Sequence, residues 1–100
     1  MRAAERKGST DMSGIVKRAV AGTLESSDVF VEIEPGDSGI KVEIESVVLA
    51  QFGDAIRAAA LDVLKEQNVS DARVRLTDRG ALDCVIRARV ETAVARAKGE

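Results

Sequence analysis

The chain has 100 residues, of which 45% are hydrophobic and only 2% aromatic, and its formal net charge at pH 7 is −2. This length fits one folded domain with a modest aliphatic core, because typical domains hold roughly 100–150 residues. The acidic excess is concentrated in residues 25–54, which carry eight acidic side chains and one lysine. Because such a surface repels phosphate backbones, we expect no nucleic-acid partner.

The residue types that are missing narrow the possible functions further. The sequence contains no histidine, tyrosine or tryptophan and only one cysteine, Cys84. This excludes an intrachain disulfide, argues against a metal site and removes the usual general bases of an enzyme. We expect Cys84 to be a buried or half-buried inert thiol. No apolar run approaches the roughly 20 residues of a membrane span, and the N-terminus lacks a secretory signal, so we expect a cytoplasmic protein without membrane association.

The N-terminal half predicts strands after a polar beginning. Residues 1–14 are polar and rich in turn formers, so we expect a flexible tail there and a single folded domain over residues 15–100. Residues 15–24 favour a short irregular strand. Residues 29–34 and 40–45 alternate apolar and charged side chains, which predicts two strands. A turn that contains Pro and Gly separates them, so we expect the two strands to pair as a hairpin with a wide loop.

The C-terminal half predicts two helices around a further strand. After the second alternating segment, apolar residues recur at three- and four-residue steps and predict an amphipathic helix with Phe52 on its inward stripe. Residues 72–77 predict another alternating strand, whose arginines should share the outer face of the sheet with the glutamates of the earlier strands. A second helix follows, with Leu82 on its apolar side. Asp78 is placed to cap the start of that helix.

The expected order of elements is therefore (β)-β-β-α-β-α. Each strand has one apolar face, so both helices should cover the same face of the sheet. We predict an α+β fold: a two-layer sandwich with a mainly antiparallel sheet of three or four strands and two helices on one face.

One motif carries candidate chemistry. The segment AGTLESSDV at residues 21–29 places Ser26 and Ser27 beside carboxylates, just ahead of an alternating strand. No nearby residue type is suited to activate either serine as a nucleophile. Turn chemistry alone explains such a pair, since serine and aspartate often hydrogen-bond to the backbone of turns. A serine displayed without such machinery can also be a residue on which another protein acts.

Together with QFGDAIR at residues 51–57 and DRGALDCVIRARVE at residues 78–91, this motif resembles the acyl carrier (gamma) subunit of citrate lyase. The resemblance covers about residues 19–97. It implies a carrier subunit that is not itself an enzyme. In it Ser26, the serine after glutamate, would hold a covalent prosthetic group, 2'-(5''-phosphoribosyl)-3'-dephospho-CoA. The sulfur of that group would carry acetyl and citryl thioesters while citrate is split into acetate and oxaloacetate.

The resemblance also implies partners. These are the alpha subunit, which exchanges acetyl for citryl, the beta subunit, which releases oxaloacetate, and the transferase that attaches the prosthetic group. Alternatives stay open: the chain could be the carrier subunit of malonate decarboxylase or citramalate lyase, or an unmodified interaction domain in which the serine run is only a turn. An independent enzyme would need a means of activating a hydroxyl that no residue obviously supplies.

Overall fold

A computed structural model of the chain describes residues 14–47 and 49–99. The elements in these ranges follow the predicted order: β1 (Ala19–Gly22), β2 (Val29–Pro35), β3 (Ile40–Ser46), α1 (Leu49–Glu66), β4 (Ala72–Asp78) and α2 (Asp83–Ala97). Nearly all of the segment that was expected to be a flexible tail lies outside the described residues, so that prediction stays open.

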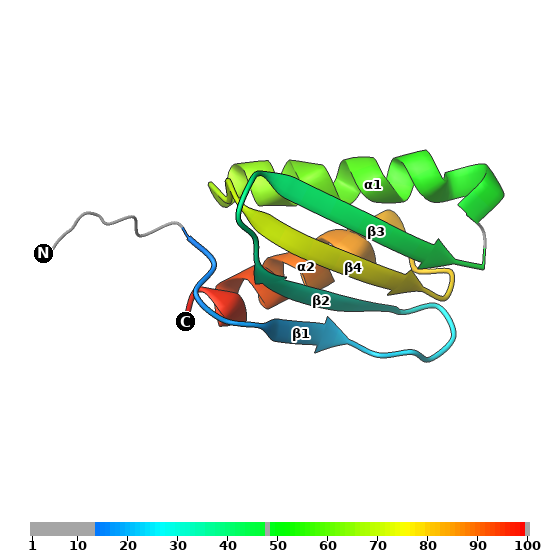
Figure 1. Ribbon diagram of the computed structural model, residues 1–100. Coiled ribbons are helices and arrows are strands. Elements are labelled where there is room, and N and C mark those ends of the chain that lie inside the picture. Colours follow the sequence, from blue (N-terminus) through cyan, green and yellow to red (C-terminus); the bar gives the residue numbers. More distant parts are fainter. Residues whose placement is uncertain (1–13, 48, 100) are drawn as a thin grey trace, which may run out of the picture.

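The four strands form one mixed sheet in the order β1-β2-β4-β3 (Figure 1). β2 is antiparallel to both β1 and β4, whereas β3 runs parallel to β4. Both helices lie on the same face of the sheet: α2 packs on β1 and β2, α1 packs on β3, and the helices contact each other. The predicted α+β sandwich with a mainly antiparallel sheet and two helices on one face is confirmed.

The predicted hairpin between β2 and β3 is wrong, because β4 lies between these strands and pairs with both. The connection over residues 36–39 opens around the start of β4, where the amide of Ala72 donates to the carbonyl oxygen of Gly39 at 3.1 Å. At Gly36, a Cβ would lie 2.8 Å from the nitrogen of Ala72, so the close approach of the two backbones requires glycine. Alternation identifies a strand and its buried face, but it does not identify the neighbouring strand.

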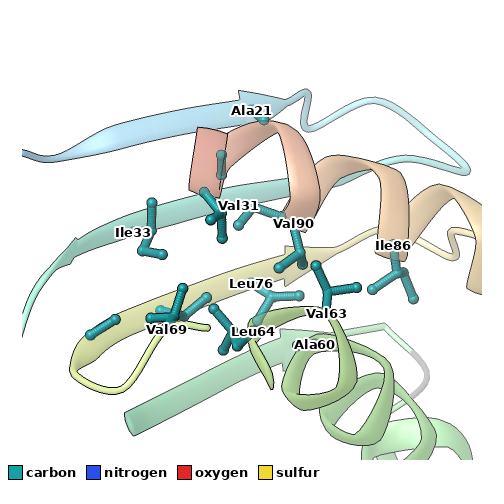
Figure 2. Packing of buried hydrophobic residues seen from close by; sticks show 14 of the residues in the cluster. Ala21, Val31, Ile33, Ala60, Val63, Leu64, Val69, Leu76, Ile86 and Val90 are labelled. Atoms are coloured by element: carbon teal, nitrogen blue, oxygen red, sulfur yellow. The ribbon is translucent and has the colours of Figure 1, made fainter. Parts of the chain in front are cut away.

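The core lies between the sheet and the helices and consists of aliphatic side chains (Figure 2). The inward residues predicted for β2 and β4 are buried, with Val31, Ile33 and Leu76 as the central ones, whereas those of the edge strand β3 are only partly buried and pack against this core. Small residues such as Ala60 and Ala93 are fully buried on the helices and let them approach the sheet closely. Burial of each large aliphatic side chain contributes roughly 1.5–3 kcal/mol, which accounts for a stable domain with almost no aromatic residues.

The other face of the sheet carries the expected charges. Ion pairs link neighbouring strands and the segment before β1: Arg18–Glu32 at 2.7 Å, Arg73–Glu34 at 3.4 Å and Arg75–Glu45 at 3.6 Å. Exposed cross-strand pairs of this kind contribute about 0.2–1 kcal/mol each. They therefore support the pairing of the strands and do not mark a functional site.

Three predictions about individual side chains are wrong. Phe52 and Leu82, which were expected on apolar inward stripes, are 52% and 70% exposed. Cys84, in the first turn of α2, is exposed as well. All three lie where a helix begins. Periodicity gives the direction of a side chain around a helix axis, but it does not show whether another element extends far enough to cover the first turn.

Candidate functional site

Ser26 lies in the loop between β1 and β2, which we call the Ser26 loop (residues 23–28). This loop is at the end of the molecule that also holds the β4–α2 connection and the start of α1 (Figure 1). Ser26 and Ser27 are both exposed. Within the described part of the chain, no residue hydrogen-bonds to the hydroxyl of Ser26. The hydroxyl is therefore open to a partner from outside the chain.

A tight turn shapes the tip of the loop. The amide of Asp28 donates to the carbonyl oxygen of Glu25 at 3.1 Å, so Ser26 and Ser27 are the two central residues of the turn. Ser27 has a φ of 66°, whereas Ser26 is not among the residues with positive φ. This combination is typical of a type II turn, whose second central position favours glycine. Ser26 thus occupies the first corner of the turn in an ordinary backbone conformation.

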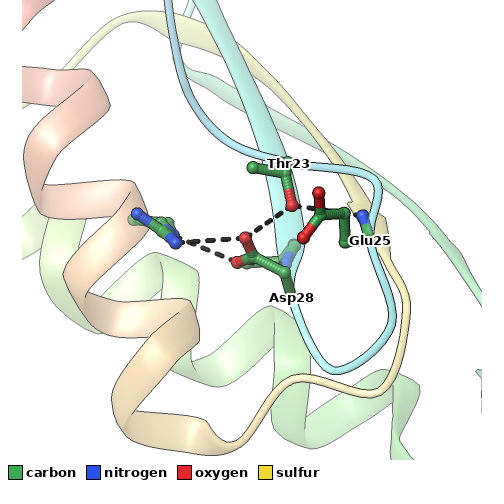
Figure 3. A network of polar contacts seen from close by, with 5 residues as sticks. Thr23, Glu25 and Asp28 are labelled. Atoms are coloured by element: carbon green, nitrogen blue, oxygen red, sulfur yellow. Dashed lines mark hydrogen bonds and ion pairs between the residues drawn. The ribbon is translucent and has the colours of Figure 1, made fainter.

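Asp28 fixes the base of the loop (Figure 3). Arg89 of α2 donates to both of its carboxylate oxygens, from Nε to Oδ1 and from Nη2 to Oδ2, each at 3.0 Å. The hydroxyl of Thr23 donates to Oδ2 of Asp28 at 2.7 Å, and the amide of Glu25 donates to the same hydroxyl oxygen of Thr23 at 3.1 Å. These bonds hold the two ends of the Ser26 loop together and tie both to the second helix.

The bidentate hydrogen bond from Arg89 lowers the pKa of Asp28 to about 2. Partial burial acts in the opposite direction, while hydrogen bonds from the hydroxyl of Thr23 and the amide of Val29 lower the pKa of Asp28 further. Near neutral pH, a carboxylate with so low a pKa is a poor general base, because a base works best when its pKa is close to the working pH. Asp28 therefore positions the loop and does not activate a serine.

A second set of bonds joins the Ser26 loop to the β4–α2 connection. The amide of Ser27 donates to the carbonyl oxygen of Arg79 at 2.8 Å, and the amide of Arg79 donates to the carbonyl oxygen of Asp28 at 2.9 Å. The two bonds extend the pairing of β2 and β4 past the pair Val29–Asp78, with Ser27 and Asp28 both opposite Arg79. The backbone of Ser27 is thus fixed to the β4–α2 connection, whereas the side chain of Ser26 remains exposed to solvent.

Asp78, which is only 2% exposed, shapes the connection itself. Its carboxylate accepts hydrogen bonds from the amides of Gly80 at 3.2 Å and Ala81 at 3.0 Å and from the hydroxyl of Ser46 at 2.7 Å. The prediction that Asp78 caps α2 is wrong, because the N-cap of that helix is Leu82, without a side-chain capping bond. The acidic side chain instead organises the turn before the helix.

Two residues of the site were missed by sequence reasoning. Arg89 lies 61 positions from Asp28, and no spacing rule connects residues so far apart. Gly22 ends β1 with a φ of 88°, and a Cβ at this position would lie 1.9 Å from the carbonyl oxygen of Val29. The glycine within the serine motif was the available signal for such a close backbone approach.

An apolar cleft of about 350 Å³ lies beside the β4–α2 connection. Its walls come from the first turns of both helices and from the connection, and include Phe52, Ala55, Ile56, Ala81, Leu82 and Ile86. The exposed aromatic and leucine side chains noted above therefore border a hollow. A further hollow of about 240 Å³ lies on the outer face of the sheet, and its lining includes side chains that form the ion pairs described above.

The described ranges offer no alternative centre for metal chemistry, because no group of three His, Cys, Asp or Glu side chains in them is arranged to hold an ion. Of the helices in these ranges, neither has the length and apolar character needed to cross a membrane.

Comparison with known proteins places these features in a family. The family model described as malonate decarboxylase delta subunit (MdcD) matches residues 16–97. Three curated proteins named citrate lyase acyl carrier protein are similar to the chain. The one from Pectobacterium atrosepticum is 51% identical over 83% of this chain and 86% of its own length. The one from Edwardsiella ictaluri is 57% identical over 79% and 82%, and the one from Escherichia fergusonii is 55% identical over 83% and 87%.

The fold also occurs among solved structures. A chain in the crystal structure of a Pseudomonas malonate decarboxylase hetero-tetramer in complex with malonate matches with a TM-score of 0.73. The match covers 83% of this chain and 86% of that chain, at 23% sequence identity. At this level of identity the likeness shows a shared fold.

Proposed function

We propose, since the chain belongs to the family of citrate lyase acyl carrier proteins, that it is the acyl carrier subunit of a citrate lyase complex. In this proposal Ser26 bears a covalent phosphoribosyl-dephospho-CoA group, and the subunit is not itself catalytic. When bound, the group supplies the thiol that carries acyl chains, while the protein supplies attachment and orientation. The single observation that carries the proposal is the exposed Ser26 hydroxyl at the corner of a turn whose base is held by Arg89.

The residues present fit such a group. The attachment would need a hydroxyl that another protein can reach, and the side chain of Ser26 is exposed. The phosphodiester would add negative charge, and the exposed Arg79 belongs to the backbone segment that pairs with Ser27. Of the two acids in the motif, Asp28 is paired with Arg89, whereas Glu25, directly before Ser26, is exposed to solvent. The loop therefore meets the steric needs of the modification, and Arg79 offers a positive charge close to it.

The chain's own residues would act by holding and orienting the attachment point. The hydrogen bonds from Arg89 and Thr23 to Asp28 fix the base of the loop. The loop is therefore already ordered when a partner protein binds, and binding does not have to offset the entropy of ordering it. No described residue hydrogen-bonds to the hydroxyl of Ser26, which supports leaving the removal of its proton to the prosthetic-group transferase. The alpha and beta subunits of the lyase would then act in turn on the group carried by Ser26.

Ser26 is favoured over Ser27 as the attachment point for a structural reason. The amide of Ser27 donates a hydrogen bond to the carbonyl oxygen of Arg79, and the backbone of Ser27 lies in the left-handed region. Ser26 has neither constraint, so its side chain and backbone can adapt to the active site of a modifying enzyme. This supports the choice that the motif itself suggests.

A carrier subunit of malonate decarboxylase is the second candidate, because the matching family model bears that description. The 51–57% identity to three citrate lyase carriers favours the first candidate. The two differ in the reaction that a reconstituted complex performs, namely cleavage of citrate or decarboxylation of malonate.

The proposal is tested by expressing the chain with the prosthetic-group transferase and the precursor of the group, followed by intact mass measurement and reconstitution with the alpha and beta subunits. We expect an adduct on the wild-type chain and on Ser27→Ala, and citrate cleavage with both. Ser26→Ala should keep its circular dichroism spectrum but lose the adduct and the turnover. A complex that cleaves citrate with an unmodified carrier would overturn the proposal.

A further inference from the structure

The apolar cleft beside the Ser26 loop has no part in the attachment proposed above. Its rim is formed by Phe52 and Leu82, two large apolar side chains that are 52% and 70% exposed. The deeper wall is formed by Ile56 and Ile86, which are only 3% exposed. The cleft thus runs from the surface down to the edge of the core. Its apolar walls favour a ligand that can displace water from them.

Exposed apolar residues gather at this end of the molecule. Of the six large hydrophobic residues that are exposed in the described ranges, four lie here. These are Leu24 in the Ser26 loop, Val47 after β3, Phe52 in the first turn of α1 and Leu82 before α2. Single exposed apolar residues need no explanation, but Phe52 and Leu82 border the same cleft, and exposed apolar residues that share a hollow mark a binding surface.

The cleft and the Ser26 loop are in direct backbone contact. The amide of Ser27 donates to the carbonyl oxygen of Arg79 at 2.8 Å, and the next residue, Gly80, lines the cleft. Ser26 directly precedes the donor residue Ser27, and Gly80 directly follows the acceptor residue Arg79, so the two positions lie close together. The space beside Gly80 is open, because a Cβ at this position would meet no atom within 4 Å. Beside Gly80, therefore, nothing blocks a chain that leaves Ser26 toward the cleft.

We propose that this cleft is a resting site for the thiol-bearing arm that is tethered to Ser26. The inference rests on the proposed function, which supplies the arm. The thiol-bearing end of the prosthetic group, beyond its nucleotide and phosphates, is a slender chain of methylene, methyl and amide groups. A mostly apolar cleft of about 350 Å³ is near the lower end of the range for small-ligand sites and suits this end of the group. Tethering gives the arm an effective concentration of the order of millimolar at the cleft, so weak apolar contacts suffice to occupy it.

The matched pair Ala55→Phe and Ala58→Phe tests this site. Both alanines are exposed on α1, but only Ala55 lines the cleft. A phenyl ring at position 55 should fill the cleft without entering the core, whereas the same ring at position 58 should leave the cleft open. Circular dichroism of the unmodified variants checks that each one folds.

The readout is the set of backbone amide chemical shifts of the full chain before and after attachment, with attachment verified by intact mass. For the wild-type chain we expect shifts in the Ser26 loop and also in residues 52–56 and 80–86. Ala58→Phe should behave in the same way. In Ala55→Phe the shifts around the cleft should disappear, while those in the Ser26 loop remain.

The contradicting outcomes are distinct. A loaded wild-type chain whose shifts are confined to residues 23–28 would show that the arm stays in solvent, which overturns the resting site and leaves the attachment intact. Unchanged cleft shifts in loaded Ala55→Phe, together with weaker binding of the alpha subunit, would assign the cleft to a protein partner and overturn the inference. A chain that acquires no adduct would overturn the proposed function and the resting site together.

Discussion

Arg89 and Asp28 form a two-pronged contact in which Nε and Nη2 of the guanidinium each lie 3.0 Å from a carboxylate oxygen. The contact connects the middle of α2 to the residue that ends the Ser26 loop, across 61 positions of sequence. The side chain of Asp28 is 13% exposed, so the pair is partly shielded from solvent and stronger than an ordinary surface ion pair. The attachment loop is therefore preorganised by the helix behind it.

This contact predicts a specific dependence of stability on pH. Arg89 lowers the pKa of Asp28 from 3.8 to about 2 on folding, so the folded state binds the proton more weakly than the unfolded chain. The stabilisation is complete above about pH 4 and is lost as the pH falls from about 4 to about 2. After allowance for solvent screening we expect a loss of about 1 kcal/mol over this range.

Denaturant unfolding of the wild-type chain and of Asp28→Asn at pH 5, 4, 3 and 2 measures that loss. The variant cannot ionise at position 28, so its free energy of unfolding should fall less steeply between pH 4 and pH 2. Equal slopes for the two proteins would show that the Arg89 contact does not hold the loop in solution.

Ser27 should tolerate glycine but not a β-branched residue. Its φ of 66° lies in the left-handed region, which costs non-glycine residues roughly 1–2 kcal/mol. Ser27→Gly removes this cost but makes the unfolded chain more flexible, so the free energy of unfolding should change by less than about 1 kcal/mol. Ser27→Val should lose about 1–2 kcal/mol, because valine fits this region poorly. If Ser27→Val unfolds at the same temperature as Ser27→Gly, the result would contradict the left-handed turn geometry at this position.

Gly22 should be far less replaceable than Gly39, although both have a φ of 88°. Alanine at either position incurs the cost of a left-handed backbone, about 1–2 kcal/mol. At Gly22 the new Cβ would also lie 1.9 Å from the carbonyl oxygen of Val29, whereas at Gly39 it would meet nothing within 4 Å.

We therefore expect Gly22→Ala to lose at least about 1 kcal/mol more than Gly39→Ala in denaturant unfolding, since the β1–β2 pair must move apart. Because this movement displaces the start of the Ser26 loop, Gly22→Ala should also slow the attachment reaction. Equal destabilisation by the two substitutions would mean that the close approach at Gly22 is absent.

The sequence predicted the elements well because the signals for them are local. Alternation over residues 29–34 and 40–45 marked strands, and the helical stripe correctly placed residues such as Ile56 and Leu64 in the core. The strand order was not predictable in the same way. The insertion of β4 between β2 and β3 depends on contacts between distant segments, which a period of two residues does not encode.

The site was predicted in part. The serine motif indicated which residue matters, but not the turn that displays it or the arginine that holds the loop. Phe52 and Leu82 were expected in the core, and they instead border a cleft at the end where the Ser26 loop lies. Apolar residues at a binding surface can follow the same helical spacing as residues of the core. The spacing alone therefore cannot tell an exposed apolar residue from a buried one.

The position of the prosthetic group on the chain is the most direct test of this account. Cleavage after Arg18 and Lys41 releases a peptide of residues 19–41 that contains Ser26, Ser27 and Ser38. Fragmentation of this peptide from the protein matured with its transferase should place the added mass on Ser26. Added mass on another residue, or a bare peptide recovered from a complex that still cleaves citrate, would contradict the account.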